Sequence, residues 1–134
     1  MTFITAEHVV HDSQPWGVTD WYVSPEVTGS TQLVVVQITI DPGQGHAFHV
    51  HPEQEEAIVV IEGTLTQWIG EQRQQLSPGE GVHVGAGIVH ASINETERLV
   101  RAIVTLGPCV GETNGYVQVD KSDEEPWRTL GATR

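Results

Sequence analysis

Short runs of β-branched and aromatic residues, each closed by glycine or proline, recur along most of the chain. One of them, QLVVVQITI at 32–40, leads directly into the turn sequence DPGQG. Valine, isoleucine and the aromatic residues pack well on a pleated strand, whereas glycine and proline adopt the dihedral angles that turns need. These runs predict strands at 16–23, 32–40, 49–51, 56–62, 64–69, 81–84, 90–93 and 99–106. Strands this short and this closely spaced indicate an all-β protein, folded as a small antiparallel sandwich or barrel.

Helical signals are confined to the segment SDEEPWRTL at 122–130. Ser122 and Glu125 have the spacing of a capping box, and Pro126 is tolerated in a first helical turn. The segment predicts either one short helix or only an ordered tail. With 134 residues and no linker or repeat, the chain is expected to form a single domain. We expect N-terminal strands within 1–31, a core at about 33–106 and a C-terminal tail at 107–134.

The charge balance excludes some partners. Six lysines and arginines against eighteen acidic residues give a formal charge of −12, which repels nucleic acid and anionic membranes. The N-terminal MTFITAEHVV lacks the features of a signal peptide, and no run reaches the roughly 18 apolar residues of a membrane helix. One cysteine, Cys109, requires no oxidising compartment. We therefore expect a cytoplasmic protein whose partner is a small molecule, with neither nucleic acid nor membrane bound.

Two histidines two residues apart, His49 and His51, precede an apolar strand. Alternate residues of a strand share a face, so both imidazoles can reach one metal ion about 2 Å away. By the same alternation Glu56 shares a face with Ile58 and Val60 on the next strand. A fourth ligand can arrive from His90, at the start of the run 90–93.

At this point the sequence resembles the cupin family. GQGHAFHVHPEQEEAIVVIEG at 43–63 resembles the first cupin motif, G-x5-H-x-H-x3,4-E-x6-G. GEGVHVGAGIVHASIN, which ends at Asn94, resembles the second, G-x5-P-x-G-x2-H-x3-N, although Gly85 stands where the family has proline. The matching positions are Gly43, His49, His51, Glu56 and Gly63 in the first motif, and Gly79, Gly87, His90 and Asn94 in the second.

The resemblance implies a jelly-roll barrel, also called a double-stranded β-helix, that binds one divalent transition metal. The residues that match the family ligands are His49, His51, Glu56 and His90. Three imidazoles and one carboxylate favour Fe, Mn, Ni or Cu, with Zn possible, and in octahedral geometry they leave two positions open. Glu55 also satisfies the motif spacing, but strand alternation and the six residues before Gly63 favour Glu56.

Other polar and aromatic residues have simpler interpretations. Among the tryptophans, Trp68 is the best candidate for a pocket wall, because its strand follows the Glu56 strand directly. Asn94 is expected to tie down a turn. We expect the remaining charged and histidine side chains near the motifs and the N-terminus to be surface, rim or turn residues: His8, His11, His46, His83, Glu53 and Glu55.

Ligand identity alone does not set the reaction. Few cations lie on core strands, which disfavours phosphate or dicarboxylate substrates, while apolar walls suit a small molecule that chelates metal through oxygen. These features resemble the quercetinase-like dioxygenases among the cupins, with Glu56 as both ligand and catalytic base. A metal-dependent isomerase or lyase and a non-enzymatic binding protein remain alternatives. The outward positions Val59 and Ile61, with the N-terminal strands, further predict a homodimer.

Overall fold

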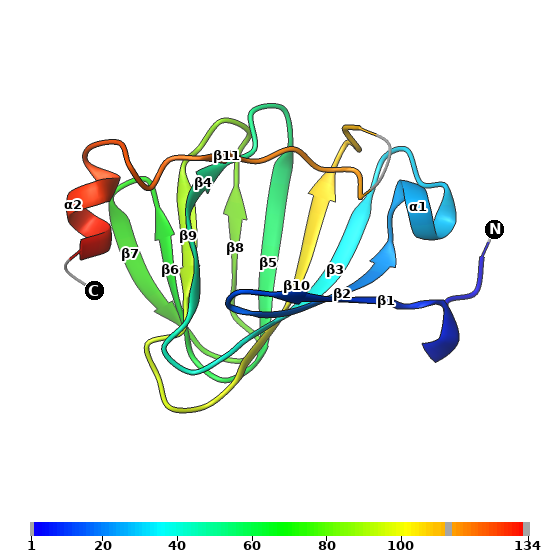
Figure 1. The fold of residues 1–134 in the computed structure, drawn as a ribbon, viewed down its shortest axis with the longest axis horizontal. Coiled ribbons are helices and arrows are strands. Elements are labelled where there is room, and N and C mark those ends of the chain that lie inside the picture. Colours follow the sequence, from blue (N-terminus) through cyan, green and yellow to red (C-terminus); the bar gives the residue numbers. More distant parts are fainter. Residues whose placement is uncertain (1, 112–113, 133–134) are drawn as a thin grey trace.

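Two antiparallel sheets face each other in the computed structural model, which describes residues 2–111 and 114–132 (Figure 1). The six-stranded sheet has the order β1-β2-β3-β10-β5-β8, and the five-stranded sheet has the order β11-β4-β9-β6-β7. The strands of the first sheet are β1 (Val10–Gln14), β2 (Gly17–Val23), β3 (Val34–Ile40), β10 (Val100–Gly107), β5 (Glu55–Glu62) and β8 (Gly81–Val84). Those of the second are β11 (Val119–Asp120), β4 (Gly45–Val50), β9 (His90–Ile93), β6 (Leu65–Ile69) and β7 (Gln72–Leu76). The all-β, jelly-roll prediction is confirmed.

All eight predicted strands are present, although β4 begins four residues earlier than predicted, at Gly45. The sequence pattern gave no range for β1 within the expected N-terminal strands, and it missed β7, β11 and two short helices, the 3₁₀ helix η1 (Ala6–His8) and α1 (Pro25–Thr28). Helix α1 begins after Ser24, whose Oγ accepts a hydrogen bond from the backbone N–H of Val27, and it ends at Gly29 with φ 71°. None of the helices in the described part of the chain has the length and hydropathy needed to cross a bilayer.

The C-terminal helix exists, but the predicted capping box does not. Helix α2 (Trp127–Ala132) begins five residues after Ser122, whose hydroxyl donates to Asp120 instead (2.7 Å). Glu125 precedes the helix and accepts from the Thr129 hydroxyl (2.7 Å). The motif failed because the helix starts at Trp127, too far along the chain for Ser122 to be its N-cap residue.

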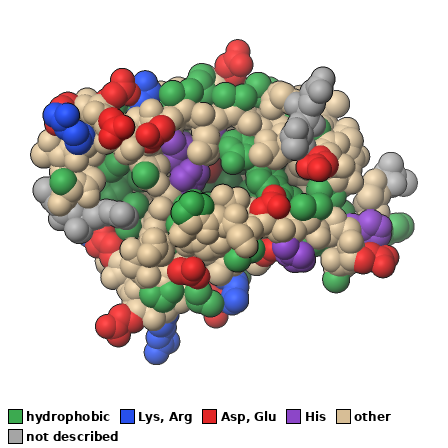
Figure 2. All heavy atoms as spheres, in the orientation of Figure 1, with side chains coloured by type: hydrophobic (Ala, Val, Ile, Leu, Met, Phe, Trp, Pro, Cys, Tyr) green, Lys and Arg blue, Asp and Glu red, His purple; other side chains and the backbone are tan. Residues whose placement is uncertain are grey.

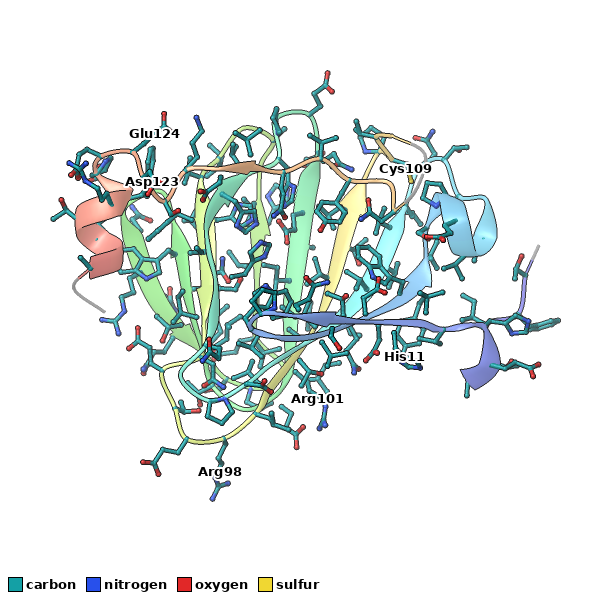
Figure 3. The ribbon with its side chains drawn as sticks, in the orientation of Figure 1. His11, Arg98, Arg101, Cys109, Asp123 and Glu124 are labelled. Carbon is teal, nitrogen blue, oxygen red and sulfur yellow. The ribbon has the colours of Figure 1, made fainter. Side chains whose placement is uncertain are left out.

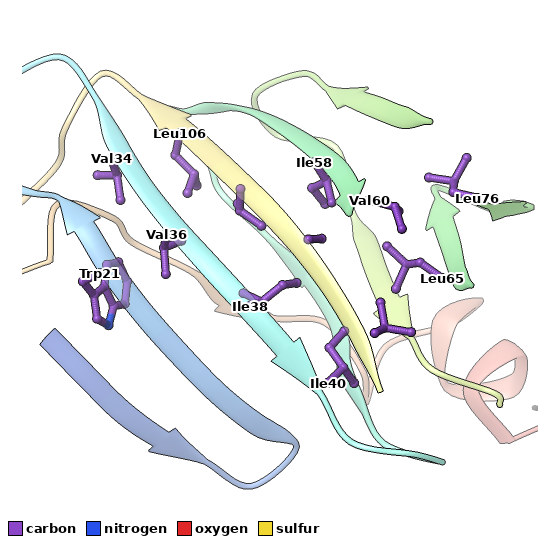
Figure 4. Close-up of a cluster of buried hydrophobic side chains, with 13 residues drawn as sticks. Trp21, Val34, Val36, Ile38, Ile40, Ile58, Val60, Leu65, Leu76 and Leu106 are labelled. Atoms are coloured by element: carbon purple, nitrogen blue, oxygen red, sulfur yellow. The ribbon is translucent and has the colours of Figure 1, made fainter. Parts of the chain in front are cut away.

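The core lies between the sheets and is built by strand alternation. Every second residue of β3 and β10 is buried, and Ala102 of β10 pairs with both Ile38 and Val60 (Figure 4). A small side chain on the central strand lets the larger residues of β3 and β5 close over it. The inward faces thus form one apolar layer that supports the polar residues at one end of the barrel.

The opposite end of the barrel is fixed by Asn94, as predicted. Its side-chain N–H groups donate to the carbonyls of Ile40 (3.0 Å) and Arg98 (2.6 Å), and its oxygen accepts from the backbone N–H of Thr96 (3.0 Å). Asn94 is fully buried, so these bonds satisfy groups that water cannot reach. The asparagine therefore holds the turn after β9 against the end of β3.

Candidate metal centre

Four predicted ligands meet at one end of the barrel because of how their strands pair. His49 of β4 pairs directly with His90, the first residue of β9, and His51 follows the end of β4. The turn at 51–54 then leads into β5, where Glu56 lies near the start of the strand. All four side chains are buried, and their ligand atoms lie within 4.8 Å of one another. Glu56 lies in this buried cluster, as strand alternation favours, whereas Glu55 is exposed.

Close contacts within the cluster leave buried polar atoms unsatisfied. The Oε2 atom of Glu56 lies 2.7 Å from Nε2 of His90 and 3.2 Å from Nε2 of His51. Even so, Glu56 Oε2 and His90 Nε2 have no hydrogen-bond partner among the described residues. Buried polar atoms without partners are costly, and a cation between them would satisfy both. Three imidazole nitrogens and a carboxylate fit a mid-to-late first-row divalent metal ion.

Each imidazole is oriented by a backbone carbonyl on its other nitrogen. The Nδ1 atom of His49 lies 2.7 Å from the carbonyl oxygen of Ala47, and Nδ1 of His90 lies 3.0 Å from that of Ile88. For His51 the partner is the carbonyl oxygen of Val117, at 2.9 Å. When Nδ1–H donates to a carbonyl, the Nε2 lone pair is free to bind metal. The three histidines are therefore held in the tautomer that a shared ion requires.

The pKa values respond to burial and to the closeness of these groups. Burial would raise the pKa of Glu56, but the imidazoles of His51 and His90 outweigh it and lower this pKa. Burial would lower the pKa of His90, but Glu56 outweighs it and raises that value above 6.5. Burial and the neighbouring His46 hold the pKa of His49 well below its usual range. Glu56 is thus ionised at neutral pH and attracts positive charge.

His46 is not the surface or turn residue that its position in the strand predicted. Its ring stacks on His49 with centroids 3.9 Å apart and on Trp16 at 5.5 Å. The pairing of β4 with β9 shifts register between His46 and His49, and this irregularity turns His46 back toward the interior. Burial lowers the pKa of His46 to about 4, so its imidazole is neutral at pH 7.

A pocket opens beside the ligand cluster, and His49, His51 and Glu56 form part of its lining (Figure 2). Its walls include the aromatic rings of Trp16, Trp21 and Tyr116, where Tyr116 stacks on Trp21 with centroids 5.6 Å apart. Aliphatic side chains of the six-stranded sheet complete the apolar lining: Val36, Ile38, Ile58, Val104 and Leu106. The choice of Trp68 as the pocket tryptophan was wrong. Trp68 packs edge-on against Phe48 on the outer face of the five-stranded sheet, under helix α2.

The lining residues of this pocket include neither lysine nor arginine. Arg101 pairs with Glu62 at the surface, and Figure 3 shows Arg98 and Arg101 pointing outward at the lower end of the barrel. The other predicted surface groups behave as expected: His83 pairs with Glu55 (2.8 Å), both well exposed, and His8, His11 and Glu53 are exposed. The pocket is therefore apolar except at the ligand cluster and a few neutral polar groups.

Pattern reasoning missed three of the pocket residues. Trp16 and Trp21 belong to the predicted strand 16–23. Strand alternation predicts which side chains share a face, but it does not predict which part of that face borders a cavity. Tyr116 lies in the segment described as a tail, where no periodic pattern exists to place it. The two-residue spacing of Thr19 and Trp21 could have indicated that both side chains lie on one face of β2. In the structure that face is the buried inner one.

Comparisons with known proteins agree with this geometry. Residues 36–106 match the family model described as "Cupin domain". Protein SchB of Streptomyces halstedii is 24% identical over 103 residues, covering 76% of this chain and 75% of that protein. Quercetin 2,3-dioxygenase of Bacillus subtilis (strain 168) is 35% identical over 60 residues, which are 45% of this chain but only 18% of the dioxygenase.

A solved structure also shares the fold. An uncharacterised conserved protein with a double-stranded β-helix domain, from Klebsiella pneumoniae, superposes with a TM-score of 0.68 at 21% identity. The superposition covers 90% of this chain and 99% of that one. Because the identity is low, this likeness concerns the fold alone.

Proposed function

The chain belongs to the cupin family, and on that basis we propose that it is a mononuclear metal-dependent dioxygenase. Its substrate is a small apolar molecule that chelates the metal through oxygen atoms. The observation that carries this proposal is the position of the apolar pocket, whose lining includes His49, His51 and Glu56 themselves. A substrate held against those walls has its polar end at the ligand cluster.

The composition of the pocket argues against charged substrates. Recognition of a phosphate or dicarboxylate usually requires a bidentate arginine or a lysine, and neither lines this pocket. Stacked aromatic rings and aliphatic side chains instead favour a flat, apolar molecule. The resemblance to 60 residues of a quercetin 2,3-dioxygenase supports the same substrate class.

His49, His51, Glu56 and His90 would hold the metal, which would supply Lewis acidity and redox exchange with dioxygen. Glu56 then has a second role, as the base that accepts the proton of a substrate hydroxyl group. It lines the pocket and is ionised at neutral pH, so it can receive that proton. The apolar walls exclude water, which strengthens electrostatic interactions between the substrate and the ligand cluster.

Loading the metal-free protein separately with Fe, Mn, Ni, Co and Cu tests the proposal. Dioxygen consumption is followed with flavonols and β-diketones, which are apolar and chelate through oxygen. We expect uptake of dioxygen with at least one metal and substrate, and its loss in Glu56→Ala. Turnover that proceeds equally well without dioxygen would contradict the proposal and favour the isomerase or lyase alternative. Tight ligand binding without turnover would favour a binding protein.

We also propose that the outer face of the six-stranded sheet binds a second copy of the chain. Val59 and Ile61 are 47% and 49% exposed on β5, and Ile103 of β10 is the cross-strand neighbour of Val59. Contiguous apolar residues in the middle of a sheet face favour a partner over water. An identical face on a second copy can cover them in a two-fold arrangement.

A further inference from the structure

The chain after β10 returns across the ligand end of the barrel (Figure 1), where β11 is the edge strand beside β4. We call residues 114–121 the crossing segment. One end of it is fixed by pairing of Val119 with Val50 of β4, and by a bond from the Lys121 N–H to the Phe48 carbonyl (2.9 Å). No described strand pairs with residues 114–118, and the other end has one backbone hydrogen bond, from the Val110 N–H to the Gly115 carbonyl (2.8 Å).

Gln54 holds that other end. Its side chain is 1% exposed, and its Nε2 donates to the carbonyl oxygens of Pro108 (2.7 Å) and Gly115 (2.9 Å). Its Oε1 accepts from the backbone N–H of Val117 (3.2 Å). One buried amide thus joins the turn before β5 to Pro108, which follows β10, and to Gly115 and Val117 of the crossing segment. A fully buried glutamine that satisfies three backbone groups is specific to one backbone arrangement.

Two consequences of this arrangement reach the ligand cluster. The backbone N–H of Val117 donates to Gln54, and the backbone carbonyl of the same residue accepts the hydrogen bond from Nδ1 of His51. The neighbouring Tyr116 packs edge-on against His51, with ring centroids 5.7 Å apart, and forms part of the pocket wall. Both the orientation of one ligand and the shape of the pocket therefore depend on where residues 115–117 lie.

We propose that Gln54 is a positioning residue for the metal centre, acting through Val117 and Tyr116 to orient His51 and to shape the pocket. The proposal rests on the proposed function only in requiring that the cluster binds metal. Gln54 touches neither the ligands' Nε2 atoms nor the pocket, so its effect is indirect. Outer contacts of this kind commonly change metal affinity about 10- to 100-fold when removed.

The test compares Gln54→Glu with a matched control, Asn94→Asp. Both native amides are buried, and each donates to two backbone carbonyls and accepts from one backbone N–H. Either substitution places a carboxylate against those carbonyls. The two sites differ in that Asn94 lies at the end of the barrel away from the ligands. Both variants should therefore lose thermal stability, but only one should alter the metal centre.

The readouts are Co(II) affinity, measured by competition with a chelator, and the visible absorption spectrum of the Co(II) protein. We expect Gln54→Glu to bind Co(II) about 10- to 100-fold more weakly, with a changed spectrum. Asn94→Asp should keep the affinity and spectrum of the unmodified protein. If Gln54→Glu does not fold, Gln54→Met, which has similar length and no charge, is measured in its place.

Three results would contradict either the positioning role of Gln54 or the proposed function, and they can be told apart. If the unmodified protein binds Co(II) and the Gln54 variant that is measured shares its affinity and spectrum, the positioning role is wrong while metal binding stands. If the unmodified protein binds none of the divalent metals, the proposed function itself fails. Equal effects of Gln54→Glu and Asn94→Asp on the spectrum would show that both act through general destabilisation, which also overturns the positioning role.

Discussion

Nε2 of His90 and Oε2 of Glu56 lie 2.7 Å apart inside the barrel, and neither atom has a hydrogen-bond partner among the described residues. Because Nδ1–H of His90 donates to the Ile88 carbonyl, its Nε2 carries no hydrogen, and two acceptor atoms face each other without a donor. The ligand atoms of these two residues and of His49 and His51 lie within 4.8 Å of one another. This geometry is typical of ligands arranged around an ion.

Removing one histidine of the cluster should release the metal. We expect His49→Ala, His51→Ala and His90→Ala each to lose most of the bound metal, because three remaining ligands hold it more weakly. His83→Ala is the control, since His83 is exposed and pairs only with Glu55. Elemental analysis of the purified variants measures the result. A full metal complement in His51→Ala would show that the ligands are wrongly assigned.

Metal affinity should rise with pH above 6.5. In the metal-free protein Glu56 raises the pKa of His90, and the metal competes with that proton. The raised pKa means that protonated His90 contributes stability fully below 6.5, and this contribution is lost as the pH rises through the folded-state value. Over the same range, added metal should therefore give a growing increase in the melting temperature. A metal-induced increase that stays constant above pH 6.5 would contradict this assignment.

His46 should make the metal-free protein sensitive to acid. Burial lowers its pKa to about 4, so between 6.5 and about 4 the unfolded chain binds more protons than the folded one. Stability from this source is present above 6.5 and is lost as the pH falls toward 4. His46→Phe keeps the stacked ring and should lose less stability over this range in urea titrations. His83→Phe changes an exposed histidine and should behave like the unmodified protein.

Gly115→Ala should destabilise the protein more than Gly111→Ala. Both glycines have positive φ, 81° and 79°, so either substitution costs about 1–3 kcal/mol of backbone strain. At Gly115 an added Cβ would also lie 2.7 Å from Cδ of Pro25 and 2.9 Å from a methyl group of Val34, whereas at Gly111 nothing lies within 4 Å. Chemical denaturation measures the difference. Equal losses would mean that Gly115 is not closely packed.

A charge on the outer sheet face should separate the proposed dimer. Val59→Lys places an ammonium group among apolar residues that a second copy would cover, so the pair should dissociate into monomers. Ile88→Lys is the control, because Ile88 is similarly exposed (42%) but lies outside that sheet. Light scattering at micromolar concentration gives the mass. A monomer before any substitution would remove the dimer proposal.

Sequence patterns predicted the strands that bury an apolar face and missed those that do not. Strand β3 alternates buried and half-buried residues, and its β-branched run identifies it. Strand β7 reads QRQQL with four exposed residues, so no hydrophobic period marks it, and it exists because β6 pairs with it. Strand β1 is similar: it is almost wholly exposed and depends on β2.

The ligand cluster was predictable because its residues match fixed motif spacings on strands or directly beside them. The supporting residues were not. Gln54 appears among charged residues in HPEQEE, and its burial depends on a chain segment about sixty residues later. His46 was misplaced by an irregularity in β4 that strict alternation cannot anticipate. Local periodicity thus locates the ligands, while long-range contacts decide what surrounds them.

The carbonyls that orient the three histidines differ in how many residues separate each carbonyl from its histidine. His49 and His90 use carbonyls two residues earlier, so each can adopt its orientation as soon as its own strand forms. His51 depends on Val117, 66 residues later. During synthesis from the N-terminus, the ribosome must therefore add residue 117 before His51 can be oriented as in the complete fold. The ligand cluster is therefore completed only after the strands that carry its residues have all been made.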